Sequence, residues 1–130
     1  MPMYTRRPYL PNPIGIAEDI KKQLAEIGIR VIIEPPRDET DFWARSRKGT
    51  YDIALYGWIS DFLDPDGTFS ALLAKQFVGT ANLSRYANPQ FDDLLMKARS
   101  QSVPGERLKL YKSAQSLFPK DLPFEFLELL

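Results

Sequence analysis

The residues best suited to bind a charged ligand lie in the stretch YDIALYGWISDFLDPDGTF, which runs from Tyr51 to Phe69. Its candidate carboxylate is Asp61, which follows an expected strand and can pair with a cation such as an ammonium group. Charge-assisted hydrogen bonds of this kind are shorter and stronger than neutral ones. A loop Asp can instead hydrogen-bond its own backbone, so position alone leaves both interpretations of Asp61 open.

Three residues just before Asp61 offer aromatic surface and space for a ligand. Tyr56 and Trp58 can form the wall of a pocket. Gly57 lets the backbone approach a ligand closely, because it has no side chain. The alternative for Trp58 is core packing, in which case its indole N–H needs a hydrogen-bond partner.

Two further candidate ligand contacts, Asn82 and Arg85, lie in the segment 75–86. This segment lacks helical or strand periodicity, so we expect an ordered loop, and long ordered loops are often functional. Arg85 can meet a ligand carboxylate, or it can hold the loop by a salt bridge.

The chemistry open to this chain is limited by the complete absence of Cys and His. That absence excludes disulfides, thiol nucleophiles, Ser-His-Asp triads and zinc sites built from Cys and His. Asp64 and Asp66 do not fit a calcium-binding EF-hand loop, because its first and twelfth positions would be Phe62 and Leu73. We expect no metal, no cofactor and no reaction, and an enzyme that uses Asp61 and Asp64 as paired carboxylates is one alternative.

The composition predicts one folded domain that spans residues 1–130. Hydrophobic residues make up 44% and charged residues 26% of the chain, as in ordinary globular proteins. Basic and acidic residues number 17 each, so the formal net charge is zero, which argues against nucleic acid as the main partner. The apolar runs are shorter than a membrane span, and we recognise no signal peptide at the start.

The first half of the chain is expected to alternate between strands and helices. Strands are expected over residues 1–5, 29–34 and 51–56. The run 29–34 is almost wholly apolar except Arg30, which predicts a strand covered on both faces. One helix should begin after Asn12 and another after Asp38 or Thr40, which are all good capping residues. This order implies right-handed crossovers and a parallel sheet, for which we expect the strand order 2-1-3.

The second half is expected to be mainly helical. Asp64 followed by Pro65 has the form of a helix cap. Helices are expected over 68–74, after Asn88, and in a last long helix that ends at Pro119, with a final strand over 124–130. The fold class is α/β, a mainly parallel sheet with helices on both faces. Ligands of such sheets bind beyond the carboxyl ends of the strands, where the GW pair and Asp61 would lie.

Several segments resemble the extracellular solute-binding proteins of family 5, the peptide-, nickel- and oligopeptide-binding receptors of ABC importers. They are RPYLPNPIGIAEDIKKQLAEIGIRVII, RKGTYDIALYGWISDFLDPDGTF, and NLSRYANPQFDDLLMKARS followed by ERLKLYKSAQ. The second segment, in which GW precedes an Asp and then DPD, is the most specific. The resemblance covers most of the chain from Arg6 to Gln115 and implies one lobe, the second or carboxyl-side one, of a type II periplasmic-binding-protein fold.

The resemblance also implies roles for individual residues. In peptide-binding members, the Asp three residues after the Trp of the GW pair binds the amino terminus of the peptide, which assigns that role to Asp61 and the pocket wall to Trp58. Some members carry an Arg two residues before the Gly, where it can meet ligand carboxylates, and this chain has Leu55 there.

The implied function is a ligand-binding lobe of a substrate-binding protein for ABC-type import, with a small peptide or similar solute as ligand. The implied partners are a first lobe, absent from this chain, and the membrane subunits of the importer. The implied location is periplasmic or extracellular, with or without a membrane anchor. The alternative is a free-standing interaction or oligomerisation domain that kept the fold, lost the transport role and self-associates through the exposed lobe face.

Overall fold

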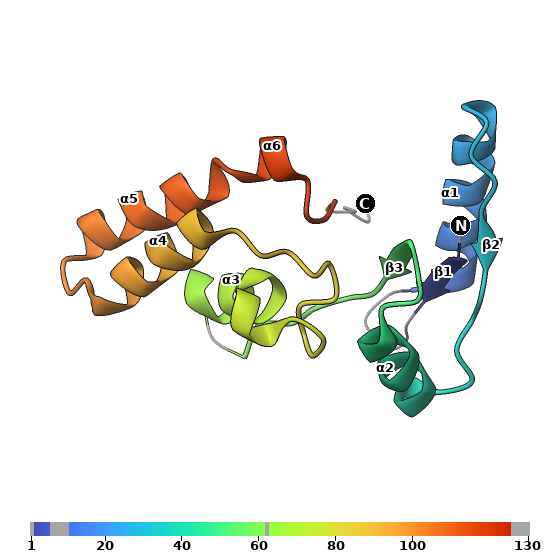
Figure 1. Ribbon diagram of the computed structural model, residues 1–130, viewed down its shortest axis with the longest axis horizontal. Coiled ribbons are helices and arrows are strands. Elements are labelled where there is room, and N and C mark those ends of the chain that lie inside the picture. Colours follow the sequence, from blue (N-terminus) through green and yellow to red (C-terminus); the bar gives the residue numbers. More distant parts are fainter. Residues whose placement is uncertain (1, 6–10, 62, 126–130) are drawn as a thin grey trace. The chain divides into compact units, whose positions relative to one another are not determined.

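The computed structural model describes residues 2–5, 11–61 and 63–125 of the chain (Figure 1). It divides into two compact units, Met1–Ile59 and Ser60–Leu130. The three strands lie in the first unit, and the second unit is built around helices. A single α/β domain over residues 1–130 stays a prediction.

The first unit contains a small parallel sheet. Its strands are β1, Pro2–Thr5, β2, Ile32–Ile33, and β3, Ile53–Leu55. They lie in the order β2-β1-β3, and β1 pairs in parallel with both neighbours, so that Met3 is opposite Ile33 on one side and Ile53 on the other. The predicted strand order and direction are confirmed. All three strands run toward the same edge, and β3 leads directly into the GW segment.

Two helices accompany this sheet: α1, Pro13–Glu26, and α2, Glu39–Lys48. Asn12 caps α1, because its side-chain oxygen accepts a hydrogen bond from the Gly15 backbone N–H at 3.2 Å. Asp38 caps α2 by accepting from the Asp41 N–H at 2.8 Å, so Thr40 lies inside the helix and is not the cap. Helix α1 packs against β1 and β2, and α2 lies against β1. Helices on both faces of the sheet stay a prediction.

The core of the first unit lies between α1 and the strands. Ala17, Val31 and Leu55 are its buried members. Partly buried aliphatic side chains pack around them: Ile16, Ile20, Leu24, Ile33 and Ile53. The predicted second strand is shortened to two residues, and Ile32 is 52% exposed, so the expectation that both faces of this strand are covered is wrong at Ile32.

The second unit holds four α-helices and a short 3₁₀ turn among its described residues. They are α3, Pro65–Leu73, η1, Lys75–Phe77, α4, Pro89–Ser100, α5, Pro104–Gln115, and α6, Phe118–Asp121. Helices α4 and α5 lie side by side (Figure 1). Phe91 of α4 is fully buried, with its ring centroid 6.2 Å from Phe69, 5.5 Å from Tyr86 and 5.8 Å from Phe118. Aromatic packing therefore forms the core of this unit.

The structure corrects several predicted boundaries in the second unit. Helix α3 begins at Pro65, three residues earlier than expected, because Asp64 caps it. The last long helix ends at Gln115, and Pro119 lies in the first turn of α6, where a missing N–H costs no hydrogen bond. Phe124 and Glu125 are not in a strand, and the rest of the predicted final strand lies outside the described residues. In the part of the chain that the structure describes, no helix combines the length and apolar character needed to cross a membrane.

Candidate functional site

Tyr56 follows β3 and is partly buried against α2. Its ring centroid lies 6.3 Å from that of Phe42, a fully buried residue of α2. Burial, helped by the nearby Tyr51 phenol, raises the pKa of Tyr56 to about 12. Tyr56 is thus a neutral side chain at physiological pH, so it can supply aromatic wall but no negative charge to a site.

Trp58 is also partly buried, and so is Gly57 beside it. The Trp58 indole nitrogen is enclosed, and no hydrogen-bond acceptor for it is found among the described residues. Core packing would have required such an acceptor, because an unsatisfied buried donor costs about 1–3 kcal/mol. The pocket-wall role of Trp58 stays a prediction, and its unmatched donor is the feature that distinguishes it from an ordinary core Trp.

Asp61 is exposed at the start of the second unit. Within the described part of the chain, its carboxylate takes part in no hydrogen bond or ion pair. An exposed carboxylate without an internal partner is free to bind a cation from solution. Binding of a ligand ammonium group by Asp61 stays a prediction.

Asp64 is occupied, in contrast to Asp61. One of its oxygens accepts a hydrogen bond from the Asp66 backbone N–H at 2.9 Å, which caps α3. Arg107 donates from Nη1 to Oδ2 at 2.6 Å and from Nη2 to Oδ1 at 2.9 Å. These hydrogen bonds hold the pKa of Asp64 below its usual value. Asp64 is therefore a cap and an ion-pair partner. It is not placed to act as the second carboxylate that the enzyme alternative with Asp61 and Asp64 requires.

Asp66 is likewise occupied within α3. Its Oδ1 accepts hydrogen bonds from Arg99 Nε at 2.9 Å and from Ser70 Oγ at 2.8 Å. Arg99 also donates from Nη2 to Ser70 Oγ at 2.6 Å. The three acids of the segment 61–66 thus differ: Asp64 and Asp66 are paired with arginines, and Asp61 is not.

Asn82 lies in the loop between η1 and α4 and is fully buried. Its amide nitrogen donates to the carbonyl oxygens of Ala74 at 3.2 Å and Tyr86 at 2.9 Å, and its oxygen accepts from Ser84 Oγ at 2.9 Å. All of these contacts lie within or next to the loop. They give Asn82 a structural role there, and a direct contact of Asn82 with a ligand stays a prediction.

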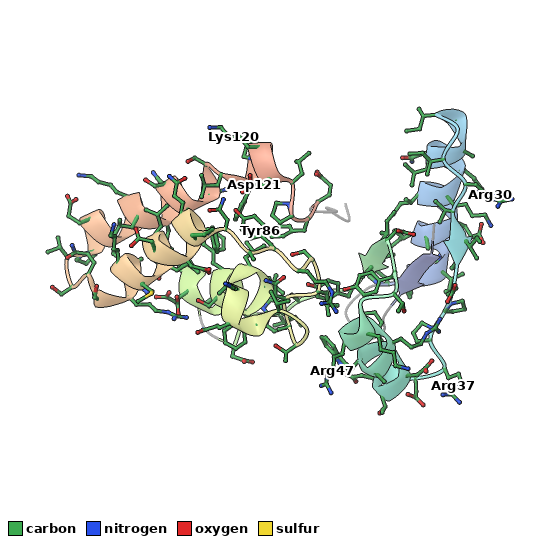
Figure 2. All side chains as sticks on the ribbon, in the orientation of Figure 1. Arg30, Arg37, Arg47, Tyr86, Lys120 and Asp121 are labelled. Atoms are coloured by element: carbon green, nitrogen blue, oxygen red, sulfur yellow. The ribbon has the colours of Figure 1, made fainter. Side chains whose placement is uncertain are left out.

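Arg85 occupies an uncommon backbone conformation in the same loop. It is exposed, and its φ of 57° lies in the left-handed region that few side-chain-bearing residues adopt. The next residue is anchored, because the Tyr86 hydroxyl donates to Asp121 Oδ2 of α6 at 2.6 Å (Figure 2). Asn88 donates to the same oxygen at 2.7 Å. The loop is therefore fixed on both sides of Arg85, at Asn82 and at Tyr86.

The six predicted ligand contacts are divided between the two units. Tyr56, Gly57 and Trp58 follow β3 in the first unit. The other three, Asp61, Asn82 and Arg85, belong to the second. No group of three or more Asp, Glu, His or Cys side chains able to hold a metal ion occurs among the described residues.

Arg99 and Arg107 belong to this region but were not predicted from the sequence. Arg107 lies 43 residues from Asp64, and Arg99 lies 33 residues from Asp66. The available signal was indirect, because the resembling segment ERLKLYKSAQ contains Arg107 and NLSRYANPQFDDLLMKARS contains Arg99. Neither spacing nor helical periodicity indicates which acid each arginine meets.

Two known proteins match most of this chain at similar levels of identity. Peptide transport periplasmic protein SapA of Salmonella typhimurium is 34% identical over 114 residues, which are 87% of this chain and 21% of that protein. Heme-binding protein A of Haemophilus influenzae is 36% identical over 115 residues, covering 88% of this chain and 21% of that protein. This chain spans about a fifth of the length of these curated relatives.

A solved structure and a family model agree with these relatives. The ABC transporter-associated periplasmic binding protein DppA from Helicobacter pylori, in complex with the peptide STSA, superposes with a TM-score of 0.83 at 37% identity. The match covers 94% of this chain and 24% of that structure. The family model described as bacterial extracellular solute-binding proteins, family 5 Middle, matches residues 3–79, which is more than half of the chain. The chain therefore belongs to the bacterial extracellular solute-binding proteins of family 5.

Proposed function

We propose that this chain forms part of the ligand-binding lobe of a substrate-binding protein for ABC-type import, with a peptide as its ligand. The proposal draws on a relative named for peptide transport and on a similar structure that holds a peptide. Its setting is periplasmic or extracellular, and its partners are a first lobe and the membrane subunits of an importer. No reaction is part of the proposal.

The observation that carries the proposal is the state of Asp61. Asp64 and Asp66 are each paired with an arginine, whereas the exposed Asp61 has no partner among the described residues. A carboxylate in this state attracts an ammonium group, and the amino terminus of a peptide is such a group. Another relative is named for binding heme. Heme presents carboxylates, which Asp61 would repel, so Asp61 favours the peptide.

The other predicted contacts have supporting roles. Trp58 and Tyr56 supply aromatic wall, Gly57 lets the backbone approach the ligand, and Arg85 is a proposed contact of the carboxylate end of the peptide. Leu55 is only 7% exposed and belongs to the core of the first unit, so no cation from that position reaches a ligand carboxylate. We propose that the amino terminus is the main recognised group.

A titration with paired peptides tests the proposal. The ¹⁵N-labelled chain is titrated with trialanine and, separately, with N-acetyl-trialanine, and amide shifts are followed by NMR. Exposed ion pairs contribute about 0.2–1 kcal/mol, so the free peptide should bind about 1.4- to fivefold more tightly than the acetylated one. Shifts at Asp61 and Trp58 should accompany binding of the free peptide.

Two other results would contradict the proposal. Equal affinity for both peptides would show that the chain does not recognise the ammonium group. If neither peptide shows saturable binding, the chain does not bind peptides of this kind. Sedimentation at the same concentrations tests the interaction-domain alternative, which predicts a stable dimer where the proposed function predicts a monomer.

A further inference from the structure

We infer that Arg107 and Arg99 are positioning residues for Asp61, which hold the helix turn beside it and neutralise the other two acids of the segment. The inference rests on the proposed function, in which Asp61 receives the ammonium group of the ligand. All of the residues concerned belong to the second unit.

Arg107 is itself fixed by α4 and α5. Its Nε donates to the Ala98 carbonyl oxygen of α4 at 3.1 Å, and its Nη2 donates to the Tyr111 hydroxyl at 2.7 Å. The guanidinium carbon also lies 5.0 Å from the centroid of the Tyr111 ring. These contacts set the plane of the guanidinium group independently of Asp64. Its remaining donors then face both oxygens of the Asp64 carboxylate in a bidentate pair.

Arg99 makes a second connection to the first turns of α3. It reaches Asp66 and Ser70, which are also hydrogen-bonded to each other. The side chains of Arg99 and Asp66 are 41% and 27% exposed, so this pair is partly shielded from water. The start of α3 is therefore joined to α4 by Arg99 and to α5 by Arg107.

This anchoring limits where Asp61 can lie. Three residues of extended chain span at most about 10 Å, so Asp61 stays within that distance of the fixed cap residue Asp64. If the pair between Asp64 and Arg107 is broken, the cap loses its connection to the α4–α5 pair. The Asp61 backbone should then sample a wider range of positions, and the carboxylate should be less often placed to meet a ligand.

Neutralisation of the neighbouring acids gives Asp61 its selectivity. A free Asp64 or Asp66 would compete for the same ammonium group a few residues away. Removal of Arg107 alone would therefore both loosen the turn and create a competing carboxylate. A clean test must remove the pair without changing the net charge.

The double variant Arg107→Gln/Asp64→Asn meets this requirement. Asn remains a good helix cap, so the variant keeps the cap and removes the bidentate ion pair, together with the Arg107 contacts to Ala98 and Tyr111. The matched control is Lys109→Gln/Glu106→Gln, which removes an exposed pair with a 2.8 Å separation on the same helix and leaves the charge of the chain equally unchanged. In both variants the ratio of affinities for trialanine and N-acetyl-trialanine is measured by NMR titration, and amide shifts are recorded without ligand.

In the Arg107→Gln/Asp64→Asn variant, the affinity ratio should fall toward one while the affinity for the acetylated peptide is retained. The Asp61 amide should shift in the ligand-free protein. The control should keep the wild-type ratio. If the double variant does not fold, Arg107→Lys and Arg99→Gln/Asp66→Asn take its place. Arg107→Lys keeps the charge without the planar fork, so its ratio should lie between wild type and one.

The outcomes separate this inference from the proposed function. The positioning role would be overturned if the folded variants kept the wild-type ratio of affinities for the two peptides and an unshifted Asp61 amide, while Asp61→Asn lowered that ratio to one. A ratio that survives Asp61→Asn would overturn the proposed function and the positioning role together. A variant that loses thermal stability but keeps the ratio would show that the arginines only stabilise the fold, which also contradicts the inference.

Discussion

Asp64 and Arg107 form a bidentate ion pair between the cap of α3 and the first half of α5, with nitrogen–oxygen distances of 2.6 and 2.9 Å. The same carboxylate also accepts the hydrogen bond that caps α3. One side chain thus fixes a helix start and joins it to a helix 43 residues away in the chain. The loop that carries Asp61 ends at this residue.

The first prediction concerns acid stability. The hydrogen bonds from Arg107 lower the pKa of Asp64 in the folded protein, so the pair stabilises the fold above the unfolded-state pKa of about 3.9. This stabilisation is lost as the pH falls through the lower, folded-state pKa. The Tm of the wild type should therefore decrease between about pH 5 and pH 2. Asp64→Asn should lower the Tm at pH 7 and make its decrease over this acidic range smaller. Circular dichroism melts at several pH values measure both.

Part of the acid sensitivity should remain in Asp64→Asn, because the pKa of Asp121 is also lowered, by hydrogen bonds from Tyr86 and Asn88. Asp93→Asn is a matched control, because Asp93 forms an exposed pair with Lys97 on the surface of α4. Its Tm at pH 7 should stay near that of wild type. An Asp64→Asn melt that coincides with wild type at pH 7 and pH 3 would contradict the prediction.

The second prediction concerns Asn82. Replacement by Ala removes a fully buried amide that donates to the carbonyl oxygens of Ala74 and Tyr86. The Ala74 oxygen keeps the Phe77 backbone N–H at 3.0 Å, whereas the Tyr86 oxygen loses its side-chain donor. Each lost hydrogen bond costs about 0.5–1.5 kcal/mol and an unsatisfied buried group about 1–3 kcal/mol, so Asn82→Ala should lower the free energy of unfolding by about 2–4 kcal/mol. Urea denaturation measures this value, with exposed Gln76→Ala as the control. A loss below about 1 kcal/mol would mean that the loop does not depend on this network.

How much of this molecule could be predicted varies with the distance along the chain over which each interaction acts. The caps at Asn12, Asp64 and Asn88 were predicted because each depends on its own residue type and on the Pro that follows it. The parallel order of the three strands was also predicted, because alternation of strands and helices restricts the connections. These features depend on local sequence and on topology.

Features that depend on contacts across the fold could not be predicted in this way. The apolar run that includes Ile32 indicated a fully covered strand, yet only two residues pair and Ile32 is half exposed. Pro119 was predicted to end a helix, but a proline also fits in the first turn of a helix, and here it lies in the first turn of α6. The pairs of Arg107 and Arg99 join residues far apart in sequence, which no local pattern identifies.

The third prediction concerns the aromatic core of the second unit. Phe91 is fully buried and contacts the rings of Phe69, Tyr86 and Phe118. Phe91→Ala should destabilise the fold by about 3–5 kcal/mol, because it removes the ring and leaves a cavity. Met96, which is 68% exposed on the same helix, provides the control. Met96→Ala should change the unfolding free energy by less than about 0.5 kcal/mol, and similar losses in both variants would contradict this assignment of the core.

Replacement of the Asp61 carboxylate shows whether this group recognises a peptide amino terminus. Asp61→Asn keeps the size and polarity of the side chain and removes its charge. Asp52→Asn removes another exposed Asp that lies just before β3. The affinities of trialanine and N-acetyl-trialanine are measured for both variants and for the wild type. We expect the preference for the free peptide to disappear in Asp61→Asn and to persist in Asp52→Asn. An unchanged preference in Asp61→Asn would contradict the proposed recognition of the amino terminus.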